Sequence, residues 1–539
     1  MKGAAKQLSA RPSLGLKALA RGLLVVIPLG LSTSALAATT LTVVPQSPLR
    51  SLDPVITTAH IIRNYGYMVY DTLLSYDSKG KIQPQMLEKW EVSDDGKTYT
   101  FVLRDGLKWH DGTPVTSADC LASITRWASL DKAGQVMASL TTSMEAVDDK
   151  TFKMSFSMPT DLVLRGLAKK STSPAFMMPE RVAKTPGSKA ITESIGSGPF
   201  KFVRDKYVPG VSAEFAKNED YVPRKEPADG LAGGHVVKVD KVVWRSMPDS
   251  FTAINALKNG EVDYIERVDY DLLPLLEKDK NINVIPNELQ GGQALMRMNH
   301  IQPPFNDKLT RQAALAAIGQ AQIMKVDIGD KRYYRLCGAI FGCGEPLESS
   351  EGVDAVINAD PEKAKQLLKE SSYKGEKVVI MQPTDYPTGG GSYTPVIAQQ
   401  LRDVGFNVEL QAMDWQSELV RRTSRKPVED GGWSILTTNA GMADLTTPLA
   451  HFAVATNGDK AWFGWPSNKE IEDLRYKFTT SGDFTEQKAL AAQIQKLEIE
   501  NVIFVPLGQW TNVGAAGNSV KGILKTPAAV YWNIEKVGG

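Results

Sequence analysis

Two separate stretches of the sequence follow the order strand, helix, strand with short connections. The first, within residues 241–268, runs KVVWRSM, DSFTAINALKNG and EVDYIERV, and Gly260 closes its helix. The second, within residues 377–413, runs KVVIMQPT, SYTPVIAQQLRDVG and FNVELQAM. Such units build parallel sheets covered by helices, so two of them predict two α/β lobes. Ligands of such folds bind between domains or beyond the carboxyl ends of strands.

Other segments carry clear element signals. TLTVVP (40–45) alternates like a strand, and residues 63–76 are typical of a buried helix that runs into a loop. Residues 116–130 predict a helix capped by Thr116 or Ser117, and Asp360 is placed to cap another. The chain has 539 residues, more than one hydrophobic core normally serves, so two or three domains are expected.

The first 37 residues have the three-part layout of a secretory signal peptide. Five basic residues and no acidic ones precede the apolar run GLLVVIPLGL, and the segment ends in Ala35-Leu36-Ala37. The run is too short to span a bilayer, which needs about 20 apolar residues. No Cys lies near the expected cleavage after Ala37, so we expect secretion to the periplasm without a lipid anchor.

Charge argues against a nucleic-acid partner. The whole chain has 62 basic and 61 acidic residues. Removing the five basic residues of 1–37 leaves 57 against 61, a net charge of −4. Nucleic-acid binding favours clustered positive charge, which this balance does not provide.

The three cysteines suit an oxidising compartment. Cys337 and Cys343 lie six residues apart, a spacing that favours a small disulfide loop. Half of a zinc site is the alternative, but a second ligand pair is not found nearby. Cys120 is left over and is expected to be a buried thiol.

The residues of a catalytic site do not come together in the sequence. The five histidines are scattered, and none pairs with another at the spacing of helical metal ligands. His110 precedes Asp111, but neighbours on a strand point to opposite faces, and the turn Asp111-Gly112-Thr113-Pro114 has a structural explanation. We therefore expect no enzyme activity, metal or cofactor. A secreted hydrolase and a chaperone-like or adhesive surface protein are the alternatives of a different class.

The segment PQMLEKWEVSDDGKTYTFVLRDGLKWHDGTPVTSADC (84–120) closely resembles the signature of the extracellular solute-binding proteins of family 5, the peptide- and nickel-binding components of ABC importers. SLDP, YDTLL, IGSGPFKF, KNEDY, MPDSFTAINALKNGEVDYIE, PPFNDKLTRQAALAAI and DPEKAKQLL fit as well, so the resemblance covers essentially the whole mature chain. The signature positions are Pro84, Trp90, Asp95, Gly96, Tyr99, Phe101, Leu103, Arg104, Gly106, His110, Asp111, Gly112 and Asp119.

The resemblance implies a fold and a division into domains. We expect the two-lobed α/β fold of the class II periplasmic binding proteins, with the ligand cleft between the lobes and an extra subdomain in lobe I. His110 and Asp111 would then mark the fold. The chain would cross between lobes near 289–295 and near 502–509. The expected parts are the signal peptide 1–37, the lobe I core 38–74, 194–290 and 505–539, the extra subdomain 75–193, and lobe II 291–504.

The resemblance also implies ligand-binding residues. In peptide binders of the family, an acid of lobe II meets the amino terminus of the ligand, and Asp444 falls at about its place. The Gly-Trp pair that precedes this acid is replaced by Asn439-Ala440, and a loop acid or helix cap is the alternative role of Asp444. Trp415 and Arg422 match a Trp and an Arg that line the cleft, and such residues suit an apolar wall and a carboxylate fork. Asn64 and Tyr65 are candidates from lobe I.

The resemblance implies a monomeric binding protein that delivers a solute to the permease of an ABC transporter. Di- and oligopeptides are the leading ligands. The alternative is a non-peptide solute, namely an opine, a sugar derivative or a metal chelate, because Asn439-Ala440 departs from the peptide-binding pattern.

Overall fold

A computed structural model describes residues 38–286, 291–384 and 392–537 of the chain. The predicted signal peptide, 1–37, lies outside the described residues. Within the described ranges, none of the helices combines the length and the apolar character needed to cross a membrane.

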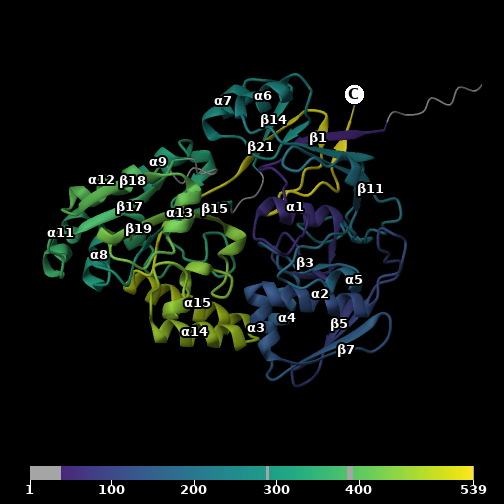
Figure 1. Cartoon of the computed structure of the whole chain (residues 1–539), viewed down its shortest axis with the longest axis horizontal. Helices are drawn as coiled ribbons and strands as arrows, with labels where there is room; N and C mark the ends of the chain where they lie inside the picture. The colour runs from purple at the N-terminus through teal and green to yellow at the C-terminus, as the bar shows by residue number, and fades with distance from the viewer. Residues whose placement is uncertain (1–37, 287–290, 385–391, 538–539) are drawn as a thin grey trace, which may run out of the picture. The chain divides into compact units, whose positions relative to one another are not determined.

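A seven-stranded sheet contains the first strand–helix–strand unit (Figure 1). Strand β1 (Thr40–Val44) lies between β12 (Lys241–Arg245) and β13 (Tyr264–Ile265) and is parallel to both. Helix α6 (Ser250–Lys258) connects β12 to β13, and Asp249 caps it as an acceptor for the N–H of Thr252. The sheet is completed by β10 (Phe200–Phe202), β11 (Ser212–Lys217), β14 (Ile282–Pro286) and β21 (Val513–Gly517).

Strand β13 is much shorter than the strand predicted for 261–268. Only Tyr264 and Ile265 are strand residues paired with β1, although the backbone N–H of Glu266 still donates to Val44 and that of Val268 to Val513. The predicted strand 40–45 corresponds to β1, which ends before Pro45. Proline lacks the N–H needed to continue the ladder.

A six-stranded sheet contains the second unit. Strands β17 (Lys377–Pro383) and β18 (Asn407–Met413) are parallel over seven residue pairs, and α12 (Thr394–Asp403) connects them. The unit predicted for 377–413 is therefore confirmed. The order β16-β20-β15-β19-β17-β18 is completed by β16 (Tyr334–Arg335), β20 (Val505–Trp510), β15 (Gly292–Met298) and β19 (Ile435–Gly441).

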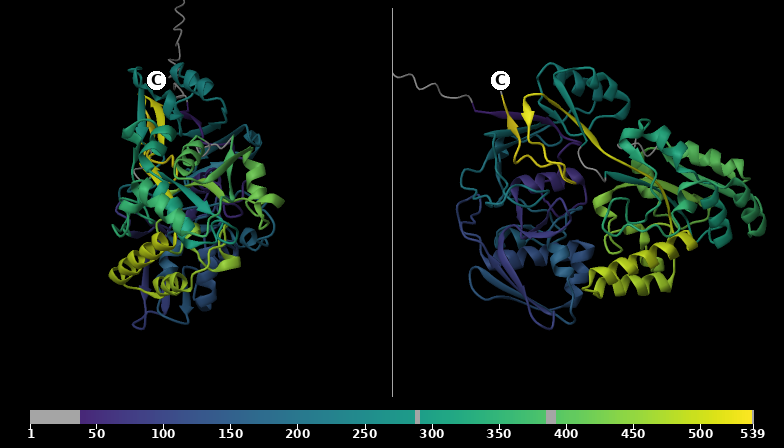
Figure 2. Two further views of the ribbon diagram at one scale, coloured as in Figure 1. Left: turned by 90° about the vertical axis from the view of Figure 1, so that its left-hand side faces the viewer. Right: turned by 180° about the vertical axis from the view of Figure 1, so that it is seen from behind.

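The chain passes between these two sheets twice. It leaves β14 at Pro286 and enters β15 at Gly292, and it returns between Trp510 of β20 and Val513 of β21. We call residues 39–286 with 513–537 lobe I and residues 292–510 lobe II. The sequence placed the return to lobe I at residue 505, where β20 begins and Val505 still pairs with Met296 of β15, and the next strand of the lobe I sheet begins at Val513. Figure 2 shows the C-terminal segment (yellow) coming back beside β1 (purple).

A four-stranded antiparallel sheet lies within the range predicted for the extra subdomain. Its order is β5 (Leu87–Val92), β6 (Thr98–Leu103), β8 (Thr151–Phe156) and β7 (Thr141–Ala146). Helix α2 (Ser117–Leu130) packs against it and begins with a capping box, in which Thr116 and Asp119 bond each other's backbone N–H. The predicted cap at Thr116 is confirmed.

Further helices and short strands complete the fold. Helix α1 (His60–Val69) is almost fully buried and is followed by the short strands β2 (Asp71–Thr72) and β3 (Leu74–Tyr76), where the sequence predicted a loop. Asp360 caps α11, as predicted. The remaining elements are α3 (Lys132–Leu140), α4 (Leu162–Leu167), α5 (Glu180–Ala183), α7 (Leu273–Glu277), α8 (Lys308–Ala317), α9 (Gln320–Asp327), α10 (Asp354–Ile357), α11 (Pro361–Glu370), α13 (Trp415–Arg421), α14 (Lys469–Thr480), α15 (Phe484–Asn501), β4 (Ile82–Pro84), β9 (Phe176–Met177), β22 (Val520–Lys521) and β23 (Glu535–Lys536).

Candidate functional site

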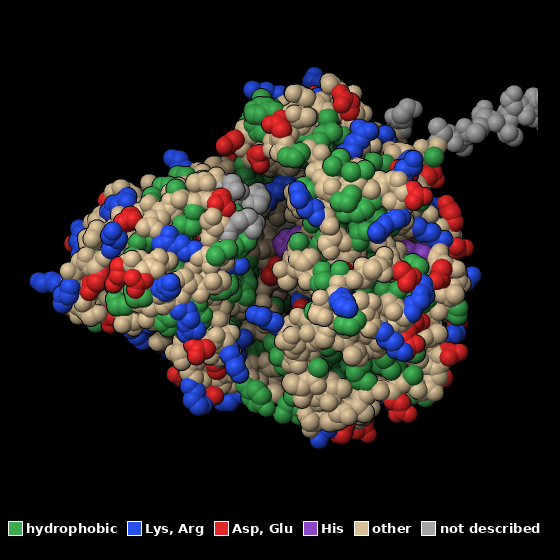
Figure 3. Space-filling view, viewed as in Figure 1, with side chains coloured by type: hydrophobic (Ala, Val, Ile, Leu, Met, Phe, Trp, Pro, Cys, Tyr) green, Lys and Arg blue, Asp and Glu red, His purple; other side chains and the backbone are tan. Residues whose placement is uncertain are grey.

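A pocket of about 700 Å³, which includes space open to solvent, lies between residues of both lobes. Lobe I contributes three residues from successive turns of α1, the two residues that follow β13, and six residues of the segment 523–530. Lobe II contributes Gly441 and Ala443, at the end of β19. Figure 3 shows a hollow on this face, with histidine and basic side chains at its wall. The residues of α1 and of the β13 end are His60, Arg63, Asn64, Glu266 and Arg267.

Asp444 lies directly beside this pocket and contacts lobe I. It ends the 3-10 helix η5 (Met442–Asp444), which follows β19. Its Oδ2 is 3.3 Å from Nε2 of His60, at the start of α1. Its Oδ1 accepts hydrogen bonds from the backbone N–H and the hydroxyl of Thr172, at 2.9 and 3.2 Å. The predicted acid of lobe II is thus held at a contact between the lobes.

The surroundings of Asp444 keep it ionised. Burial raises its pKa, but the hydrogen bond and charge of His60 and the N–H of Thr172 outweigh burial and lower the pKa of Asp444 to about 2. Its side chain is only 16% exposed. A carboxylate that is ionised and largely desolvated favours a cationic partner such as an ammonium group.

The backbone approaches closely where the lobes meet. A Cβ on Gly441 would lie 3.0 Å from Cε1 of His60, a tighter spacing than ordinary van der Waals contact. Glycine at this position lets the end of β19 reach α1. The preceding Asn439 and Ala440 still pair within the sheet, opposite Ala294 and Gln293 of β15.

The two lobe I candidates have different surroundings. Asn64 lines the pocket, is 1% exposed, and its Oδ1 has no hydrogen-bond partner among the described residues. Tyr65 is fully buried among Tyr70, Phe202 and Phe215 and does not line the pocket. Residues 64 and 65 are successive on a helix, so they face different sides of it. The side chain of Tyr65 therefore packs in the hydrophobic core and does not face the pocket.

Trp415 and Arg422 belong to a separate cluster within lobe II. The guanidinium carbon of Arg422 lies 4.5 Å from the ring centre of Phe463 and 5.8 Å from that of Trp415. Neither residue lines the pocket beside Asp444. Asn439 accepts a hydrogen bond from the hydroxyl of Tyr393 at 2.9 Å. The structure thus brings Asp444 and Asn64 to one pocket and places the other predicted residues elsewhere.

Sequence reasoning missed several residues of this pocket. His60 precedes the predicted start of the first helix, and α1 has no side-chain cap that would have marked its beginning. Glu266 and Arg267 were assigned to a strand, although they follow β13. Thr172 and the segment 523–530 carry no local signal, because their role depends on contacts distant in sequence. An uncapped helix that opens with a histidine was the one available hint.

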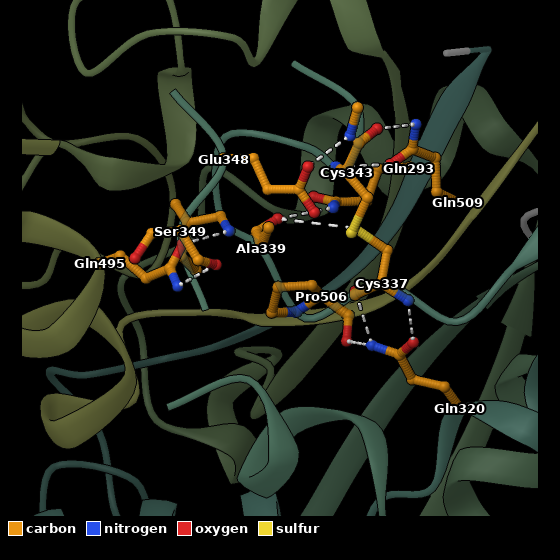
Figure 4. Close-up of a disulfide and its surroundings, with 12 residues drawn as sticks. Gln293, Gln320, Cys337, Ala339, Cys343, Glu348, Ser349, Gln495, Pro506 and Gln509 are labelled. Carbon is orange, nitrogen blue, oxygen red and sulfur yellow. Dashed lines mark hydrogen bonds between the residues drawn. A yellow bond between two sulfur atoms is a disulfide. The ribbon is translucent and has the colours of Figure 1, made fainter. Parts of the chain in front are cut away.

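A disulfide joins Cys337 to Cys343 close to the strands that connect the lobes (Figure 4). The loop is held by glutamine side chains: Gln320 bonds the backbone N–H and C=O of Cys337, and Gln509 of β20 bonds those of Cys343. The remaining cysteine, Cys120, is buried and free, as predicted.

His110 takes part in the packing of the signature segment. Its Nε2 donates to the carbonyl of Gly198 at 3.0 Å, and its Nδ1 accepts from the N–H of Gly196 at 3.4 Å. Burial lowers the pKa of His110 to about 4, so the ring is neutral. The neighbouring Asp111 instead forms an ion pair with Arg181. Among the residues that the structure describes, His, Cys, Asp and Glu side chains do not gather in threes as metal ligands would.

Known proteins resemble the chain over nearly its whole length. It is 42% identical to a probable peptide ABC transporter periplasmic-binding protein of Sinorhizobium fredii over 491 residues, 90% of this chain and 92% of that one. It is 25% identical to the glutathione-binding protein GsiB of Escherichia coli, covering 93% of this chain and 96% of that one. The crystal structure of the substrate-binding protein CtaP of Listeria monocytogenes has the same fold, with a TM-score of 0.78 and 21% identity over 93% of this chain and all of that one.

The match to a family model and the observed fold point to the same family as these relatives. The model of the bacterial extracellular solute-binding proteins, family 5, matches residues 81–463, a range that includes the four-stranded sheet and most of lobe II. The two sheets, the double connection between them and the pocket at their junction form the two-lobed α/β fold of periplasmic binding proteins. The chain therefore belongs to the family 5 bacterial extracellular solute-binding proteins.

Proposed function

We propose that the protein is the periplasmic receptor of an ABC importer and that it captures short peptides between its lobes. It would pass the closed, loaded form to the membrane permease, act as a monomer and catalyse no reaction. Residues 1–37 would direct its export and be removed.

The observation that carries this proposal is the position of Asp444. Its carboxylate is ionised, lies beside the pocket and is bonded by one imidazole and one threonine. A carboxylate can accept about four hydrogen bonds, so the ammonium group of a peptide can join or replace His60 there. The relative that is 42% identical is named for peptides, and GsiB for glutathione, which supports a peptide-like ligand.

We also propose that Trp415, Arg422 and Asn439, which lie outside the lining of the pocket beside Asp444, contact the ligand from lobe II. The cluster that Arg422 forms with Trp415 and Phe463 offers flat apolar surface beside a cation. A non-peptide solute, namely an opine, sugar derivative or metal chelate, is the second candidate, because Asn439-Ala440 stands where peptide binders have Gly-Trp.

A thermal-shift screen tests the proposal. Protein lacking residues 1–37 is refolded to strip ligand and is mixed with di-, tri- and longer peptides, with opines and sugars alongside. A ligand at about 100 times its Kd stabilises the folded protein by about 2.7 kcal/mol. We expect peptides to raise Tm. A rise with non-peptides alone would favour the second candidate, and turnover of a peptide would contradict the proposal.

A further inference from the structure

One short segment of lobe I reaches lobe II outside the pocket. It begins within α4, includes Arg165 and ends at Thr172, and we call residues 165–172 the interlobe segment. The guanidinium carbon of Arg165 lies 5.4 Å from the ring centre of Phe478, on α14 of lobe II. The side chain of Arg165 is only 16% exposed, so this cation–π contact is partly desolvated and is stronger than one in open water.

The same segment acts on lobe II at two further points. Burial raises the pKa of Glu345 in lobe II, and the charge of Lys170 opposes this rise. The N–H and hydroxyl of Thr172 both donate to Oδ1 of Asp444. Eight residues of lobe I thus contact or influence α14, the disulfide region and the loop that carries the proposed amine-binding carboxylate.

Helix α14 is itself tied to the loop that follows Asp444. Nε of Arg475, on α14, donates to the carbonyl of Pro448 at 3.1 Å. The next residue, Leu449, packs against the hydrophobic core of the part of lobe I that contains the four-stranded sheet. Both sides of the contact between Arg165 and α14 are therefore linked to the segment beside the pocket.

This contact lies far from the crossings between the lobes. Figure 1 shows α14 beside α3 and α4 in the lower part of the molecule, whereas β14 and β21, next to the crossings, lie in the upper part. A rotation of one lobe about the crossings moves such distant residues the most, so even a small opening separates Arg165 from Phe478. Arg165 does not line the pocket.

We propose that Arg165, by its contact with Phe478, sets how tightly the protein holds every ligand without touching the ligand. This inference rests on the proposed function, in which the lobes close around a solute. Closing forms the contact and opening breaks it, so its free energy favours the closed, ligand-holding arrangement. A ligand enters the open form and leaves after reopening. Arg165 is thus a positioning residue that slows dissociation and leaves association unchanged.

Binding kinetics of three variants provide the test. Arg165→Ala removes the contact, and Arg165→Lys keeps a cation near the ring. Arg425→Ala is the matched control, because Arg425 also pairs with one carboxylate, that of Asp459, and lies over one ring, that of Trp465 at 4.7 Å. Both partners of Arg425 belong to lobe II, so its loss cannot affect closure. Association and dissociation rates are measured by stopped flow for several peptides that raise the Tm of the wild type.

We expect Arg165→Ala to raise the dissociation rate about fivefold for each peptide, by the same factor, with an unchanged association rate. Arg165→Lys should retain most of the wild-type behaviour, and Arg425→Ala all of it. Thermal unfolding without ligand checks that each variant is folded at the temperature of the kinetics.

Equal dissociation rates for the wild type and Arg165→Ala would overturn this inference and leave the proposed function standing. A change confined to one peptide would also overturn it, because it would place Arg165 in contact with that ligand. If only a non-peptide solute binds the wild type, the peptide assignment fails, and the same kinetics with that solute decide the role of Arg165. A wild type that binds neither class would overturn both.

Discussion

Gly342 of the disulfide loop lies against Met442, two residues before Asp444. A Cβ on Gly342 would be 2.2 Å from Cε of Met442, and Met442 is fully buried. Gly342 also has a φ of +89°, which residues other than glycine adopt at a cost. The disulfide loop therefore forms the support beneath the 3-10 helix that carries the proposed amine-binding carboxylate.

Gly342→Ala should weaken peptide binding by roughly fivefold, about 1 kcal/mol, because the methyl end of buried Met442 has to shift and we expect the packed core to pass part of this shift on to η5. Gly112→Ala is the matched control, since Gly112 has a φ of +88° and no atom within 4 Å of its Cβ position. Both variants should lose about 1 kcal/mol of stability through backbone strain. Calorimetry and thermal unfolding separate the two effects. Equal affinities for the two variants would show that the disulfide loop does not position Asp444.

Asp444→Asn should weaken binding of peptides with a free amino terminus by more than tenfold, because a charge-assisted bond to a desolvated carboxylate is lost. N-acetylated peptides have no ammonium group and should bind wild type and variant with similar, weak affinity. Calorimetry with the free and acetylated forms of one peptide measures both. An unchanged affinity for the free peptide would remove Asp444 from the proposed site.

The low pKa of Asp444 also predicts an acid-dependent loss of stability. Its pKa falls from the usual 3.8 to about 2 on folding, so the unfolded chain binds its proton first as the pH drops. The resulting stabilisation, about 2 kcal/mol, is complete above about pH 4 and is lost as the pH falls through 2. The difference in unfolding free energy between wild type and Asp444→Asn should therefore shrink from pH 5 to pH 2, as urea titrations at each pH would measure.

The sequence predicted the parts of the fold that depend on local patterns. The cap predicted at Thr116 or Ser117 and the cap predicted at Asp360 are short-range signals, and Thr116 and Asp360 cap the two helices. The unit at 377–413 was predicted because its strands are long and apolar and are separated by a periodic helix.

The candidate site was only partly predictable, because its contacts join distant segments. Asp444 meets His60 from 384 positions earlier in the chain and Thr172 from 272 positions earlier. No local pattern encodes such pairs. Arg267 was hidden within an apparent strand, since alternation alone does not show that pairing stops at Ile265.

Asp53→Asn should destabilise the protein by about 3 kcal/mol, because it leaves the guanidinium of Arg126 buried without its countercharge. Asp53 Oδ2 accepts from Arg126 at 2.6 Å, and the two side chains are 0% and 1% exposed. Asp105→Asn provides the contrast, since Asp105 and its partner Lys150 are 89% and 56% exposed, and it should leave the unfolding free energy nearly unchanged. Equal losses in urea unfolding would mean that the Asp53–Arg126 pair adds nothing through its burial.

Glu418→Gln should stabilise the protein at pH 8 and have little effect at pH 5. Glu418 is fully buried on α13, and burial raises its pKa from 4.5 to about 8, although the charge of Arg422 opposes this rise. The folded state then keeps a proton that the unfolded chain releases, so wild-type stability falls as the pH rises from about 4.5 to 8. Between pH 5 and pH 8 this loss amounts to about 3 kcal/mol, which the uncharged glutamine avoids.

Thermal unfolding of wild type and Glu418→Gln at both pH values measures the effect, with Glu429→Gln as an exposed control that should follow the wild type. Parallel pH profiles for wild type and Glu418→Gln would show that Glu418 is ionised in the folded protein. Its carboxylate would then engage the cation of Arg422 within lobe II.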